Sequence, residues 1–171
     1  MDRFMDALCS ARRNPALPAE CDWFAPLLGD WAFTYTEPDG RTVKGEWFFR
    51  RALDGMAIED LFICPSRATR ETDPQPDAEY GAAIRMFNAE TQAYDMTYVC
   101  SKYTARLTVR RVDGAIICTV LDDPDNQWMF DRIGPDAFHW QNATVLPDGT
   151  LQINCEVRAV RLGQDGAEKR G

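Results

Sequence analysis

The sequence YTARLTVRRVDGAIICTVL, residues 103–121, decides the fold. Over 103–112, the apolar residues Leu107 and Val109 share one parity, whereas threonine and arginine occupy the other. This alternation with a period of two predicts a half-buried β-strand. Asp113-Gly114 favours a tight turn, because both residue types tolerate the positive φ angles of short hairpin turns. The stretch therefore predicts a β-hairpin.

The same alternation recurs along most of the chain between turn-forming residues. The predicted strands are 30–37, 42–52, 56–64, 80–88, 93–101, 103–112, 115–121, 127–133, 137–145 and 150–162. Tight turns, such as Pro38-Asp39-Gly40 and Pro147-Asp148-Gly149, join most of them. Short connections of this kind predict that consecutive strands pair as an antiparallel meander.

An open sheet of ten strands tends to curl, and closing it removes its exposed edges. We therefore expect an all-β fold, a ten-stranded antiparallel up-and-down β-barrel with a short N-terminal helix. A two-sheet sandwich is the alternative, but it favours longer crossover connections than these hairpins supply. In a closed ten-stranded meander, the last strand lies antiparallel beside the first.

The segments before and after the strands predict that the chain is divided into three parts. Residues 1–22 are expected to form a helix, over 2–13, followed by a linker, because apolar residues recur there at helical spacing before Asn14-Pro15. Residues 23–162 are expected to form the barrel, and residues 163–171 a flexible tail. The apolar turn 23–28 is expected to plug one end of the barrel, with Phe4 and Leu8 of the helix covering the same end.

Composition excludes several classes of partner. The formal net charge is −8, from 27 acidic and 19 basic residues, which disfavours binding to nucleic acid or to an anionic membrane surface. No apolar run approaches the length of a membrane span, and the N-terminus does not resemble a secretory signal. The six cysteines match no common zinc spacing. Reduced thiols in a cytoplasmic protein are the expected interpretation.

Gly29-Asp30-Trp31 begins the first strand, and Arg158-Ala159-Val160-Arg161 ends the last one. A G-x-W motif followed by an arginine on the last strand resembles the calycin superfamily of lipocalin-like barrels. The layout is most similar to bacterial lipocalin-like proteins of the DUF1579 type, a family of uncharacterised function. The closed meander independently brings Arg161 to Trp31, where a guanidinium stacked on indole would be stabilising. Gly29, Trp31 and Arg161 are therefore expected to have a structural role.

Strand parity predicts an aromatic lumen, which a barrel of this size can leave partly open to a ligand. Plain core packing is the alternative for each ring. The residues expected to line the lumen and contact a ligand are Phe33, Tyr35, Trp47, Phe49, Phe62, Met96, Tyr98, Trp128, Trp140, Arg132 and Asn142. Met86, Leu107, Phe130 and Phe138 are expected to face the same interior.

Polar residues on the inward parity require partners when they are buried. Asp60 and Arg132 are expected to form an internal ion pair; alternatively, they orient a polar group of the ligand. Asp60 and Tyr98 are also the candidates for acid/base catalysis, although nothing in their spacing requires it. His139, the only histidine, is expected to face outward, which makes a haem-ligand role a minor alternative and excludes a multi-histidine metal site.

These patterns lead to three functional hypotheses. The first is binding of a small, mostly apolar or aromatic molecule in the lumen, without a cofactor. Acidic residues crowd the turns at the expected mouth, so this ligand is expected to be neutral or cationic. The second is a small-molecule enzyme that uses Asp60 and Tyr98. The third is a homodimeric interaction module with outward Phe48 and Phe87. The long segment 65–79 is a candidate lid at the mouth, or a solvated insertion.

Overall fold

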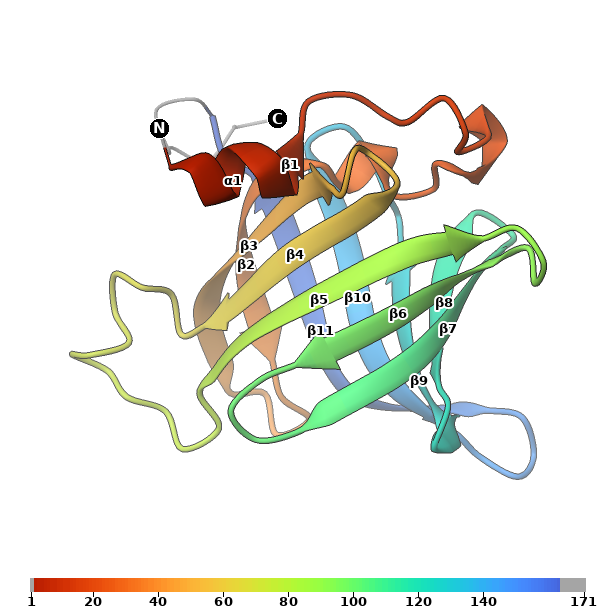
Figure 1. Cartoon of the computed structure of the whole chain (residues 1–171). Helices are drawn as coiled ribbons and strands as arrows, with labels where there is room; N and C mark the ends of the chain where they lie inside the picture. Colours follow the sequence, from red (N-terminus) through yellow and green to blue (C-terminus); the bar gives the residue numbers. More distant parts are fainter. Residues whose placement is uncertain (1, 164–171) are drawn as a thin grey trace.

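The computed structural model describes residues 2–163 as one short helix, two 3-10 turns and eleven strands (Figure 1). The helical elements are α1 (Arg3–Leu8), η1 (Ala19–Cys21) and η2 (Ala25–Leu27). The strands are β1 (Cys9–Ser10), β2 (Gly29–Thr36), β3 (Thr42–Ala52), β4 (Ala57–Cys64), β5 (Glu79–Asn88), β6 (Ala93–Val99), β7 (Thr104–Val112), β8 (Ala115–Val120), β9 (Asp123–Asp131), β10 (Ala137–Val145) and β11 (Leu151–Arg161).

The strands β2 to β11 close into a barrel. Each pairs antiparallel with the next along the chain, and β11 returns to pair with β2, so that Arg161 lies opposite Trp31. β3 also pairs with β4, so the ring has no open edge. The predicted ten-stranded antiparallel barrel is thereby confirmed, with β1 as one additional strand.

The N-terminal helix is shorter than predicted. α1 ends at Leu8, and Cys9–Ser10 forms β1, which pairs with Arg51 and Ala52 of β3. The register of β2 explains this pairing: its first residue, Gly29, lies opposite Phe49, which leaves Arg51 and Ala52 without a β2 partner on that side. Backbone groups at a free edge favour an added strand over further helix.

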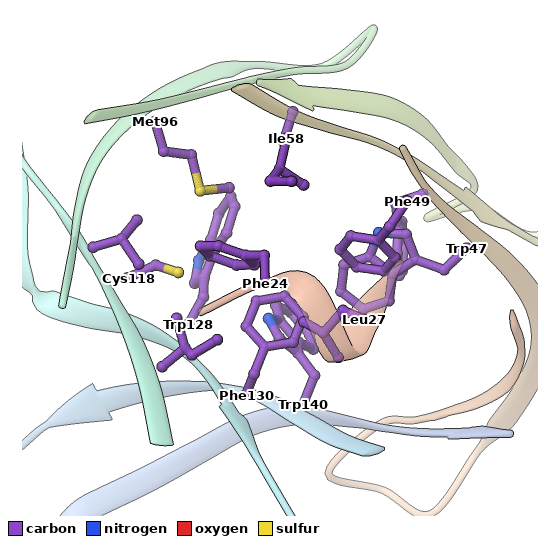
Figure 2. Packing of buried hydrophobic residues seen from close by; sticks show 14 of the residues in the cluster. Phe24, Leu27, Trp47, Phe49, Ile58, Met96, Cys118, Trp128, Phe130 and Trp140 are labelled. Carbon is purple, nitrogen blue, oxygen red and sulfur yellow. The ribbon is translucent and has the colours of Figure 1, made fainter. Parts of the chain in front are cut away.

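α1 does not cover the end of the barrel as expected. None of its residues is buried, and Phe4 is 68% exposed. The apolar turn 23–28 does plug this end, as expected, because Phe24 and Leu27, at the two ends of η2, are completely buried. Figure 2 shows both side chains among the rings of Phe49, Phe130 and other residues of the lumen.

Arg161 joins the first and last strands at the plugged end. Its guanidinium lies 4.1 Å from the centroid of the Trp31 ring, and it donates to the carbonyl oxygens of Leu28 (2.7 Å) and Pro26 (2.8 Å). Its Nε donates to the Pro135 carbonyl at 2.5 Å. Gly29 allows this approach, because its φ of 129° suits glycine and a Cβ there would collide with the guanidinium. These contacts of Arg161 therefore connect the plug to β2 and β11.

β9 begins earlier than predicted, at Asp123 instead of residue 127, because the acidic residues expected in a turn pair irregularly with β8. It ends at Asp131, since Arg132 has a φ of 47° and leaves the strand direction.

The two ends of the described chain lie together. α1 and the end of β11 are both at the plugged end of the barrel (Figure 1). The predicted tail, 163–171, lies outside the described residues from position 164 onward. Neither α1 nor the 3-10 turns of residues 2–163 have the length and apolar character that a membrane crossing requires.

Candidate functional site

A cavity of about 90 Å³ occupies the barrel interior between the plug and the mouth. Its lining residues are Tyr35, Trp47, Asp60, Phe62, Glu79, Ala83, Arg85, Met96, Tyr98, Tyr103, Trp128, Phe130, Trp140, Asn142 and Cys155. The walls are mainly aromatic, and Figure 2 shows Trp47, Met96, Trp128, Phe130 and Trp140 around this space. Such a wall suits an apolar or aromatic molecule.

A buried ion pair forms the floor of the cavity. Asp60 of β4 and Arg85 of β5 contact each other through Oδ2 and Nη2, and they are only 2% and 1% exposed. Trp47 Nε1 donates to the other carboxylate oxygen of Asp60 at 2.6 Å. Burial raises the pKa of Asp60, whereas the Arg85 charge and the Trp47 hydrogen bond oppose that rise. The two side chains thus bring opposite charges into an otherwise apolar interior.

Arg85 extends from the ion pair toward the plug. Its guanidinium lies 4.6 Å from the centroid of the Phe24 ring and 5.7 Å from that of Phe49. Its Nε and Nη1 atoms are buried and have no hydrogen-bond partner within residues 2–163. Trp128 Nε1 is likewise buried and has no hydrogen-bond partner within these residues. Because both residues line the cavity, the site contains donors that its own residues leave unused.

The structure corrects the expected partner of Asp60. The side chain of Arg132 is 75% exposed and lies outside the lumen, so it neither pairs with Asp60 nor lines the cavity. The parity of β5 is also opposite to the prediction, because Arg85 and Phe87 are buried whereas Met86 is exposed. Phe87 contacts Trp23 and Tyr94 inside the barrel, so Phe48 and Phe87 do not form the expected outer face.

A cluster of hydroxyl and carboxylate groups forms the rim toward the mouth. The Tyr98 hydroxyl donates to Glu79 Oε1, and the Tyr103 hydroxyl lies 3.5 Å from the same oxygen. Burial is the main cause of the raised pKa of Tyr98, with the carboxylate of Glu79 adding to it. Cys155 lies on the same wall, where burial raises the pKa of its thiol and keeps it neutral.

Ten of the eleven residues predicted to contact a ligand lie inside the barrel, in two groups, and Arg132 is the exception. The cavity is lined by Tyr35, Trp47, Phe62, Met96, Tyr98, Trp128, Trp140 and Asn142. Phe33 and Phe49 are buried but do not line the cavity. The ring of Phe33 stacks on that of Phe62, with 4.9 Å between the ring centroids, and the centroids of the Phe49 and Trp47 rings lie 5.1 Å apart. Sequence reasoning missed Glu79 and Arg85, which strand parity alone did not place inside.

Asp60 and Tyr98, the candidate acid/base pair, line the same cavity but bond to other partners. Asp60 is held by Arg85 and Trp47, and Tyr98 by Glu79. The carboxylate that a general base would need is therefore already neutralised by an arginine. This arrangement does not favour the hypothesis of an enzyme that uses these two residues.

His139 lies on the outer side of β10, as its neighbours Phe138 and Trp140 face inward. It is nevertheless only 6% exposed, because Nδ1 contacts Asp131 at 2.7 Å and Nε2 contacts Glu156 at 3.2 Å. Since it is the only histidine of the chain, a haem in the lumen would have no imidazole ligand. The residues therefore do not fit a histidine-ligated haem.

The long loop, residues 65–78, is attached to the barrel rather than free. Ser66 N donates to the Lys44 carbonyl at 2.9 Å, and Arg67 forms an ion pair with Glu46 at 2.6 Å. Near the mouth, Arg41 donates to Asp77 at 2.6 Å, a hydrogen bond that lowers the pKa of Asp77 to about 2. These contacts fix both ends of the loop, and its role as a lid stays a prediction.

Gly81 provides the space for Tyr98. A Cβ at position 81 would overlap the Tyr98 hydroxyl. We expect Gly81→Ala to displace this tyrosine, break its bond to Glu79 and destabilise the fold by about 1–3 kcal/mol. Urea denaturation measures the change. Gly134→Ala is the control, because its Cβ would meet only the Ala137 carbonyl at 3.5 Å. Equal stability of the two variants would contradict the prediction.

Two solved structures have a similar fold. The chain is similar to Rv2717c from M. tuberculosis, with a TM-score of 0.54 and 13% identity over 89% of this chain and 100% of that chain. It is also similar to the S-type phycobiliprotein lyase CPES from Guillardia theta, with a TM-score of 0.53 and 10% identity over 84% and 92%. A redesigned β-barrel, mFAP0, bound to DFHBI, matches with a TM-score of 0.42 and 14% identity over 80% and 99%.

No family model and no curated protein matches the sequence. Membership of the calycin superfamily or the DUF1579 type therefore stays a prediction. What the comparisons do support is a lipocalin-like barrel architecture.

Proposed function

We propose that the protein binds a small, mostly aromatic molecule inside the barrel. The observation that carries this proposal is the cavity of about 90 Å³, which has aromatic walls and a polar floor. A cavity of ~150 Å³ lined by apolar side chains is enough to hold benzene. The cavity here is smaller than that, so its volume limits the ligand to a single ring at most. The similarity to known structures concerns the fold alone, so the proposal depends on the size and lining of this cavity.

The charges around the cavity favour a ligand without negative charge. Within the lining, the Asp60 and Arg85 charges oppose each other, which leaves the Glu79 carboxylate at the rim. Glu37 and Asp77 lie close by at the mouth, both in contact with Arg41. An anion would have to pass this acidic rim and lose its hydration shell in the interior, and both steps are unfavourable.

Filling the cavity tests the proposal. Ala83 of β5 is buried and lines the cavity, whereas its neighbour Ala82 points outward on the same strand. We expect Ala83→Leu to weaken the binding of single-ring aromatic compounds at least about tenfold, because the added methyl groups occupy the ligand's space. Ala82→Leu is the matched control and should retain binding.

Tryptophan fluorescence is the measurement, since Trp47, Trp128 and Trp140 line the cavity. Native mass spectrometry of freshly purified protein would detect a retained molecule independently. The proposal is wrong if no retained molecule and no fluorescence change are found, or if both leucine variants bind equally well.

A further inference from the structure

The chemistry of the lumen ligand follows from three unused donors. Arg85 Nε, Arg85 Nη1 and Trp128 Nε1 are buried and lack an acceptor within the described residues 2–163. A buried N–H group without an acceptor costs about 1–3 kcal/mol. A molecule in the cavity can supply acceptors to these side chains, because both line it.

The position of Arg85 gives the ligand a direction. Its guanidinium stacks on Phe24 of the plug, which places it at the inner end of the cavity. The carboxylate of Glu79 lies at the rim, where Tyr98 and Tyr103 contact it. The interior therefore presents donors at its inner end and an acceptor at its outer end.

The charge of Arg85 is already balanced. Asp60 contacts its Nη2 atom directly, and the exposed fractions of both residues are 2% or less. A second carboxylate beside this pair would leave a net negative charge in an apolar interior, at a large cost in desolvation. An uncharged oxygen or nitrogen acceptor can use the N–H groups without that cost.

We propose, on the basis of the function proposed above, that the ligand is an uncharged single-ring aromatic molecule bearing a hydrogen-bond acceptor, such as a ketone or aldehyde oxygen. The acceptor enters first and bonds to the Arg85 and Trp128 N–H groups. The ring then lies among the aromatic walls formed by Phe62, Trp140 and their neighbours.

Three probes of similar size test this proposal. They are 4-fluoroacetophenone, which has a neutral acceptor, 1-ethyl-4-fluorobenzene, which has none, and 4-fluorobenzoate, which is anionic. Fluorine NMR titrations near neutral pH measure their affinities. We expect the ketone to bind roughly tenfold more tightly than the hydrocarbon, and the benzoate to bind most weakly.

The possible outcomes separate this proposal from the more general one. Equal binding of ketone and hydrocarbon would retain a ligand-binding cavity but overturn the inferred acceptor. Tightest binding of the benzoate would overturn the inferred neutrality. Binding of none of the three would overturn this proposal and the proposed function together.

A pair of tryptophan variants locates the effect. Trp128→Phe keeps an aromatic ring but removes the unused N–H, so the ratio of ketone affinity to hydrocarbon affinity should fall several-fold. Trp23→Phe is the matched control, because Trp23 Nε1 already donates to the Glu20 carbonyl at 3.0 Å. An unchanged preference in Trp128→Phe would overturn the role assigned to this residue.

Discussion

Replacing Arg85 with methionine is expected to destabilise the barrel by about 3–5 kcal/mol near neutral pH. The substitution leaves Asp60 charged and buried, with Trp47 Nε1 as its remaining hydrogen-bond donor. It also removes the guanidinium from the rings of Phe24 and Phe49. Denaturant unfolding, monitored by tryptophan fluorescence, measures the loss. A variant as stable as the natural protein would show that the ion pair does not support the fold.

The pH dependence of this variant identifies the unpaired carboxylate as the cause. Burial already raises the pKa of Asp60, and loss of the arginine removes an influence that lowers it. The folded variant then binds a proton more tightly than the unfolded chain does. Its deficit in stability should therefore shrink as the pH is lowered from about 7 to about 5, and grow as the pH rises through the folded-state pKa.

A double variant is the control for charge. In Asp60→Asn/Arg85→Met, no ionised group is left at this position, and the asparagine oxygen can still accept from Trp47. We expect this variant to recover a substantial part of the stability that Arg85→Met loses. If the double variant were less stable than the single one at every pH, lost packing and not the unpaired charge would be the dominant effect.

Replacing Arg161 with alanine is expected to cost about 2–4 kcal/mol. The change removes hydrogen bonds to the carbonyls of Pro26, Leu28 and Pro135, and uncovers one face of the Trp31 ring. Because these contacts connect the plug to both closing strands, their loss weakens the closure of the barrel. Calorimetric or denaturant unfolding checks the magnitude.

Arg161→Lys separates geometry from charge. A lysine ammonium keeps the positive charge. It lacks the planar guanidinium that contacts three carbonyl oxygens and stacks on the Trp31 indole. We expect it to restore less than half of the lost stability. Arg158→Ala is a control on the same strand, since the Arg158 side chain is 72% exposed, and it should change stability by less than about 0.5 kcal/mol.

Barrel closure could be predicted because it depends on patterns that extend over the whole chain. Alternating strands joined by tight turns make the order of strand pairing nearly unavoidable, and an even number of strands brings the last beside the first in antiparallel orientation. The approach of Arg161 to Trp31 follows from that topology. The position of the plug follows from the apolar run that contains Phe24 and Leu27.

The floor of the site could not be predicted in the same way. Met86 and Phe87 are both apolar, so the alternation of β5 fits either parity, and the wrong choice places Arg85 outside. Fully buried arginines are rare, which favours that wrong choice. The available signal was the pair of small residues, Gly81 and Ala83, which share the parity of Arg85. Glu79 was missed because it is the first residue of β5, directly after the long loop, and the predicted strand began one residue later.

The placement of α1 and Gly163, near the two ends of the described residues, offers a practical way to search for the proposed ligand. α1 and Gly163 lie at the plugged end, on the side of the barrel opposite the mouth. A protein immobilised on a resin through a tag fused beyond either end would therefore turn its entrance toward the solution. Such a column could be loaded with a cell extract and washed, and the compounds that it retards would be candidates for the proposed lumen ligand.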